Sequence, residues 1–174
     1  MVVRTGREEA TSSLLTQLPT DTWAVVTDAP SSVGLPGNVG QVAIGPPGIF
    51  VIGTKGWSGT VEVRDDVLRH DGRARATAIA DASDAASAVA RLVPMVPRAQ
   101  VRPVLCFVRA EPISASASGV IVCSTVTLVA TLSSLPPVLS PAEVRRVASE
   151  LGLALPVRPR PTLPWAGWSA SATA

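Results

Sequence analysis

The chain has 174 residues and a formal net charge of +2; 16% of its residues are charged and 3% are aromatic. This length suits one domain with a hydrophobic core of its own, and so small a net charge does not by itself indicate nucleic-acid binding. The longest apolar window, residues 119–132, is too short and too interrupted by Ser and Thr to span a bilayer. With no signal peptide at its start, the sequence predicts a cytoplasmic protein without a membrane partner.

A helix and then a strand are expected first. Residues 7–18 carry leucines at helical spacing, and Glu8 lies in the first turn, where the helix dipole favours acids. Pro19 should end this helix. Residues 23–27 have the composition of a strand that ends at Asp28. Asp28 precedes Ala29-Pro30, so it either opens a turn or has a functional role.

A β-hairpin is predicted next. Residues 41–44 and 49–52 are two apolar runs on either side of Gly45-Pro46-Pro47-Gly48. Their β-branched and aromatic residues favour strands, and the turn residues predict a type II turn with Pro47 second and Gly48 third. Both runs are apolar on both faces, which places the hairpin in the centre of a sheet.

The second strand of this hairpin continues to Lys55, the single lysine of the chain. Side chains alternate across a strand, so Val51, Gly53 and Lys55 share one face. A lysine here either keeps an exposed strand end from pairing with another chain or serves as a catalytic cation. The spacing leaves both interpretations open.

The run GPPGIFVIGTKGWSG, residues 45–59, resembles the core motif of the nuclease-related domain (NERD) family. That family belongs to the PD-(D/E)XK, restriction-endonuclease-like nucleases, and the resemblance extends in weaker form over most of the chain. It implies an α/β fold with a mixed central β-sheet flanked by helices. The two family carboxylates that hold the metal fall on Gly40 and Gly53, so Lys55 alone remains of that trio. Glu8 matches a family active-site glutamate, although the preceding family glycine is Arg7 here.

The missing carboxylates decide the expected function. Mg²⁺ requires oxygen ligands, and a nuclease of this type relies on its metal to activate water. We therefore expect a catalytically degenerate domain that is not an enzyme and binds no Mg²⁺ or Mn²⁺ unless acids are relocated. Its Lys55, Arg64 and Arg69 could still contact DNA phosphates. The alternatives are an active nuclease that uses Glu8, Asp28 or Glu62, and a protein-interaction module without nucleic acid.

A third strand is predicted at residues 60–63, where Glu62 lies on the wet face unless it has replaced a lost metal ligand. Residues 64–66 then turn the chain and residues 67–69 pair back. His70 is expected to be a turn residue beside the hairpin signal Asp71-Gly72.

The second long helix is predicted at residues 81–96, capped by Asp81 or Ser83. Residues 101–108 and 119–123 are buried strands, joined by a mobile connection at residues 109–118, and residues 124–132 are expected to form a short helix. The strand, helix, strand order fits a mixed α/β sheet. Cys106 and Cys123 are expected to be small buried hydrophobes in a reducing compartment, and with a single histidine they do not make a zinc site.

The last helix has a capping box, because Ser140 precedes Pro141 and is followed three residues later by Glu143. Gly152 is expected to end this helix. Residues 1–156 should form the domain and residues 157–174 a loosely ordered, Pro-rich tail. In the tail, Arg158, Arg160, Trp165 and Trp168 could hold nucleic acid or a protein partner.

Overall fold

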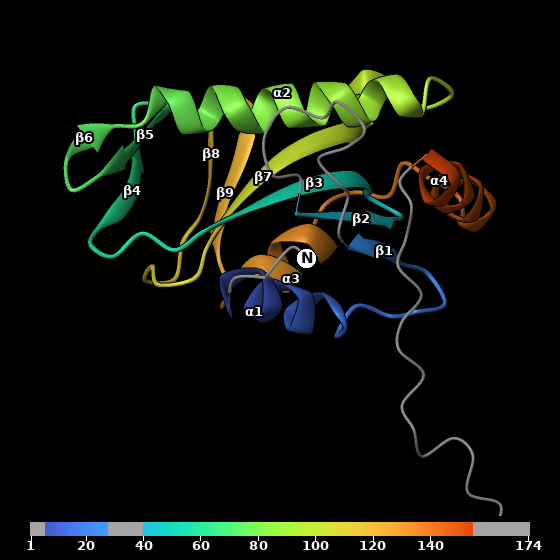
Figure 1. Cartoon of the computed structure of the whole chain (residues 1–174), viewed down its shortest axis with the longest axis horizontal. Helices are drawn as coiled ribbons and strands as arrows, with labels where there is room; N and C mark the ends of the chain where they lie inside the picture. The colour runs from blue at the N-terminus through green and yellow to red at the C-terminus, as the bar shows by residue number, and fades with distance from the viewer. Residues whose placement is uncertain (1–5, 28–39, 155–174) are drawn as a thin grey trace, which may run out of the picture.

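A mixed six-stranded sheet forms the centre of the protein, in the order β1-β2-β3-β7-β9-β8 (Figure 1). The structure is a computed structural model, and it describes residues 6–27 and 40–154. The strands are β1 (Ala24–Thr27), β2 (Gln41–Gly45), β3 (Gly48–Lys55), β7 (Val101–Phe107), β8 (Ser114–Ala117) and β9 (Val120–Ser124). The predicted fold class, a mixed sheet flanked by helices, is confirmed.

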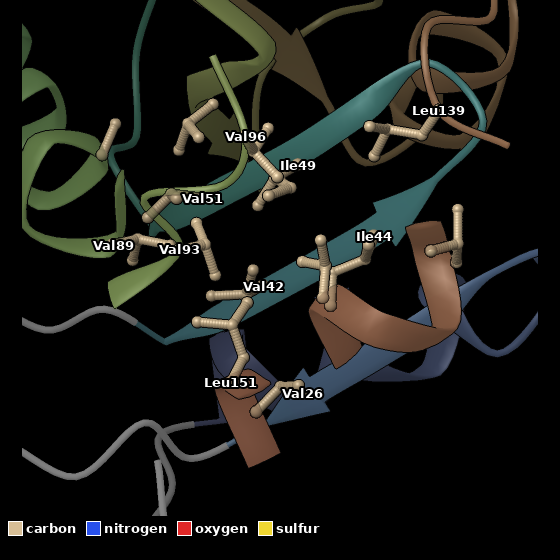
Figure 2. Close-up of a cluster of buried hydrophobic side chains, with 14 of the residues drawn as sticks. Val26, Val42, Ile44, Ile49, Val51, Val89, Val93, Val96, Leu139 and Leu151 are labelled. Atoms are coloured by element: carbon tan, nitrogen blue, oxygen red, sulfur yellow. The ribbon is translucent and has the colours of Figure 1, made fainter. Parts of the chain in front are cut away.

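Helices cover both faces of this sheet. The helices α2 (Ala76–Leu92) and α4 (Pro141–Ala154) bury one face against a cluster that includes Val42, Ile44, Ile49 and Val51 (Figure 2). The helices α1 (Gly6–Leu15) and α3 (Leu128–Ser133) cover the other face, where Phe50, Ile52 and Cys106 are buried. Because β2 and β3 are buried on both faces, their apolar residues do not alternate with polar ones.

The central hairpin is confirmed, but its turn is not the one predicted. Gly45 pairs with Gly48, so the loop consists of Pro46 and Pro47 alone. Gly48 has the positive φ expected, 133°, yet it already belongs to β3. A β-carbon on Gly48 would lie 2.6 Å from the Gln100 carbonyl oxygen, so glycine is required there by a close approach of two backbones as well. The carbonyl of Pro46 accepts the Val138 and Leu139 amides and ties the turn to the start of α4.

The chain passes from β3 through α2 to β7, and β3 and β7 are parallel neighbours in the sheet. Between β3 and α2 the chain forms a separate three-stranded sheet from β4 (Val61–Arg64), β5 (Val67–His70) and β6 (Arg73–Ala74). The strands β4 and β5 pair as predicted. His70, expected in a turn, lies in β5 opposite Val61, because the turn falls on Asp71 and Gly72.

Several boundaries differ from those predicted: α1 ends at Leu15 and not at residue 18, and α2 ends at Leu92 and not at residue 96. The helix α2 starts at Ala76, five residues before Asp81. Ala78 and Ala82 are buried, and this packing fixes the start of the helix without a polar cap. The connection at residues 109–118 contains the edge strand β8, which pairs with β9 around Ser118 and Gly119, both at positive φ. Gly152 does not end α4, which continues to Ala154.

The short 3-10 helix η2 (Arg98–Gln100) leads into β7. The capping box of α4 is confirmed: the Ser140 amide donates to Glu143 Oε2 at 2.7 Å, and the Glu143 amide donates to Ser140 Oγ at 3.3 Å. No helix in residues 6–27 or 40–154 is both long and apolar enough to cross a membrane.

Candidate nucleic-acid interface

Lys55 is the last residue of β3, and the chain continues from it into the three-stranded sheet. Its carbonyl accepts the Val108 amide at 3.0 Å, which holds the strand end against β7. The half-buried side chain of Lys55 lines a pocket of 270 Å³ between the end of β3 and the start of α2. The other lining residues are Trp57, Ala74, Arg75, Ala76, Thr77, Ala78 and Asp81.

Gly40 and Gly53 lie beside this strand end. Gln41 pairs with Ile52 at the last step of the β2–β3 ladder, so Gly40 directly precedes this step on one strand and Gly53 directly follows it on the other. Gly53 and Lys55 share one face of β3 because they are two residues apart. Neither glycine has a positive φ, and a β-carbon would meet its nearest atoms at 3.7 Å on Gly40 and 3.6 Å on Gly53. Both positions therefore accept a β-carbon without a clash.

Glu8 is held next to Gly40. Its carbonyl accepts the side-chain amide of Gln41 at 2.9 Å, and the same amide donates to Ser12 Oγ at 2.6 Å, which fastens α1 to β2. A β-carbon built on Gly40 would lie 3.8 Å from Glu8 Oε1. Of the predicted acids that the structure describes, Glu8 is thus the one placed beside a glycine that replaces a family carboxylate.

Arg7, the residue before Glu8, lies over the loop that follows β3. Its side chain occupies the space that a β-carbon on Gly56 would need, so Gly56 permits this approach. A third cationic group is thereby brought to the end of β3, in addition to Lys55 and Arg75.

The other predicted site residues lie elsewhere. Glu62 pairs with Arg64 at 3.3 Å on the exposed side of β4, and Arg69 donates to the Gly72 carbonyl at 3.2 Å. None of these three residues lines the Lys55 pocket. Asp28, Arg158, Arg160, Trp165 and Trp168 lie outside the described residues.

Arg75 is the pocket residue that sequence reasoning missed. Its Nη2 lies 3.0 Å from His70 Nδ1, and its guanidinium carbon lies 5.4 Å from the centre of the Trp57 ring. Trp57 in turn packs on His70 at 4.9 Å and on Phe107 at 5.2 Å between ring centres. The sequence holds no motif for Arg75, because only the pairing of β5 with β6 brings it to the pocket.

The donor set around Lys55 does not fit a divalent cation. Glycine supplies no side-chain oxygen at positions 40 and 53, and no three His, Cys, Asp or Glu side chains gather at any one place in the described part of the chain. What the arrangement can do is bind an anion, because Lys55 and Arg75 face one pocket.

The two cysteines lie away from this pocket, on the face that α1 and α3 cover. Cys106 and Cys123 are opposite each other on β7 and β9, both are fully buried, and both are free thiols. The hydrogen bond that Cys123 donates to Cys106 and burial together raise the pKa of Cys123. Both residues therefore pack as apolar side chains, as predicted.

Comparison with known proteins assigns the family. No curated protein and no solved structure matches the chain. The family model of the nuclease-related domain matches residues 4–108, more than half of the chain, which include the central hairpin, Lys55 and Arg75. The chain therefore belongs to the nuclease-related domain (NERD) family.

Proposed function

We propose that this chain is a catalytically degenerate NERD domain that binds nucleic acid through the basic groups at the end of β3. One observation carries the proposal: glycine stands at both positions that match the metal-binding carboxylates of the family. Neither Gly40 nor Gly53 has a positive φ angle, and a β-carbon at either would make only ordinary van der Waals contacts. The fold therefore does not require glycine at either position, and the missing acids are not a by-product of packing.

The absence of these two acids removes the carboxylate ligands that would normally hold a divalent ion. Mg²⁺ needs near-octahedral oxygen coordination, with carboxylates among its ligands. Without that ion, a nuclease of this kind lacks its means of activating water and stabilising the leaving oxygen. Lys55 alone supplies charge but no metal site.

The remaining basic groups support binding. Lys55 and Arg75 line one pocket, and Arg7 lies over the adjacent Gly56. Contacts between such cations and phosphates supply affinity without reading base sequence, and their strength falls as salt rises. We expect weak, salt-dependent binding that is indifferent to sequence.

A second candidate function is an active metal-dependent nuclease with relocated acids. It is favoured by Glu8, whose Oε1 lies near the position of a Gly40 β-carbon. Glu62 supports it less, because its carboxylate pairs with Arg64 on the exposed side of β4.

We also propose that residues 1–156 are the domain and that residues 157–174 are a tail able to hold a protein partner. A cytoplasmic location agrees with the two free thiols, which persist in a reducing compartment.

The test is to incubate the whole chain with single-stranded, linear and supercoiled DNA in Mg²⁺ or Mn²⁺. We expect a salt-dependent shift in DNA mobility, no cleavage, and loss of the shift in Lys55→Ala. Arg91→Ala, which removes an exposed charge from the far end of α2, is the matched control. Cleavage that is lost in both Lys55→Ala and Glu8→Gln would establish the second candidate instead. The absence of both a shift and cleavage would point to an interaction module.

A further inference from the structure

We propose that the 270 Å³ pocket at the end of β3 is a phosphate site in which Lys55 and Arg75 supply the positive charge and His70 positions Arg75. This inference rests on the proposed function, since a nucleic acid would present the phosphate, either within its backbone or at its 5′ end.

Size favours a phosphate group over a larger ligand. Pockets that bury drug-sized molecules measure roughly 300–1,000 Å³, and this pocket lies below that range. A phosphate group fits within this volume.

Two side chains from different elements supply the charge. Lys55 comes from the end of β3 and Arg75 from the residue before α2. Among the described residues, no carboxylate lies within salt-bridge distance of either cation. A guanidinium can bind two phosphate oxygens at once, whereas an ammonium acts as a point charge.

The start of α2 adds to these cations. Arg75 precedes the first turn, makes no side-chain cap, and no acid lies in that turn. Ala76, Thr77 and Ala78 line the pocket. The first amides of a helix have no partner within the helix, and its dipole favours an anion there.

His70 holds Arg75 in place. His70 Nε2 lies 2.8 Å from the Ser58 carbonyl, which can only accept, so Nε2 carries the hydrogen. The Nδ1 atom is then an acceptor, and Arg75 Nη2 donates to it at 3.0 Å. Trp57 lies beneath the guanidinium. These contacts therefore hold the Arg75 side chain in one orientation, although Arg75 is exposed.

Among the described residues, Asp81 is the one acid that lines the pocket, and its charge opposes an anion. It lies on α2, beyond the first turn. Substitutions in this pocket should therefore act in opposite directions. Asp81→Asn should strengthen phosphate binding, while loss of either cation should weaken it.

The experiment is calorimetric titration of the whole chain with inorganic phosphate, with chloride at matched ionic strength in the reference. Lys55→Ala and Arg75→Ala should each weaken binding roughly tenfold, as expected when a charged hydrogen bond is lost. Arg73→Ala, which removes the same charge from a nearby residue that does not line the pocket, should leave binding unchanged.

His70 needs its own control, because it could matter for stability alone. His70→Ala should weaken phosphate binding, and His70→Asn, whose amide oxygen can accept from Arg75, should restore it. Thermal unfolding of each variant shows whether the fold persists. Equal binding by wild type and His70→Ala would overturn the role of His70, and equal binding by wild type and Arg75→Ala would overturn the site.

Two oligonucleotides distinguish a backbone phosphate from a 5′-terminal phosphate as the ligand. Stronger binding of a 5′-phosphorylated strand than of its 5′-hydroxyl counterpart, lost in Arg75→Ala, would identify an end-binding pocket. Equal binding of both, weakened by Arg75→Ala, would identify a backbone phosphate. If oligonucleotides bind but Arg75→Ala has no effect, the pocket fails while the proposed function stands. If phosphate binds and oligonucleotides do not, nucleic-acid binding fails while the anion site stands.

Discussion

The Oε1 atom of Glu8 lies 3.8 Å from the place where a β-carbon on Gly40 would be. This relationship joins the first turn of α1 to the residue before β2. A side chain at position 40 would therefore project toward an existing carboxylate. Among the described residues, Glu8 is therefore the acid that lies beside Gly40.

We predict that acids placed at both glycines create a metal site. Gly40→Asp with Gly53→Asp should raise the affinity for Mn²⁺, because two carboxylates would be added at the open end of the β2–β3 hairpin, one of them beside Glu8, and hard cations prefer such oxygen donors. Calorimetric titration with Mn²⁺ measures the gain. The control is Gly40→Asn with Gly53→Asn, which has the same shape without the charges. If the aspartate variant binds Mn²⁺ no better than the asparagine variant, positions 40 and 53 do not match the metal ligands of the family.

Two glycines of β3 should respond oppositely to alanine. Gly48 has a φ of 133° and its β-carbon would lie 2.6 Å from the Gln100 carbonyl, so Gly48→Ala should destabilise by about 1–3 kcal/mol. Gly53 meets only ordinary contacts, so Gly53→Ala should stabilise by up to about 1 kcal/mol through the strand preference of alanine over glycine. Chemical denaturation of both variants measures these changes. A strongly destabilised Gly53→Ala would show that the fold needs glycine there and would weaken the case for lost acids.

The central hairpin and the α4 capping box were predictable because local rules fix them. Strands buried on both faces read as continuous apolar runs, as in β2 and β3. The Ser140 and Glu143 pair satisfies helix amides within three residues of sequence. The family motif supplied what these rules do not, namely which residues of the hairpin match a nuclease site.

The start of α2 and the role of Arg75 were not predictable in this way. Asp81 and Ser83 resemble caps, yet burial of Ala78 extends the helix past them. Arg75 enters the pocket through its contact with His70, which depends on the pairing of β4 with β5 and of β5 with β6. Such a contact is set by tertiary structure. The edge strand β8 did have a local signal, the Ser118-Gly119 turn.

The buried thiols should be unreactive in the native state. The thiolate that reacts is disfavoured at Cys123, because its hydrogen bond to Cys106 and burial raise its pKa. The same hydrogen bond lowers the pKa of Cys106, but both thiols are fully buried, so a reagent reaches neither in the folded state. A disulfide reagent should therefore modify both cysteines quickly in denaturant and very slowly in buffer. Spectroscopic titration of released thiol measures this difference. Rapid modification of the native chain would mean that β7 and β9 open readily.

The capping carboxylate of α4 should make stability depend on acid pH. Hydrogen bonds from the Ser140 amide and hydroxyl lower the pKa of Glu143. A carboxyl whose pKa is lower in the folded state stabilises that state above its unfolded pKa, about 4.3, and this contribution is lost as the pH falls through the folded pKa. Glu143→Gln keeps a capping side chain but cannot titrate, so its free energy of unfolding should fall less steeply below about pH 5 than that of the wild type. Denaturation at a series of pH values compares the slopes, and Glu150→Gln, an exposed acid of the same helix, should keep the wild-type slope. Parallel curves for wild type and Glu143→Gln would mean that the hydrogen bond to Ser140 does not persist in solution.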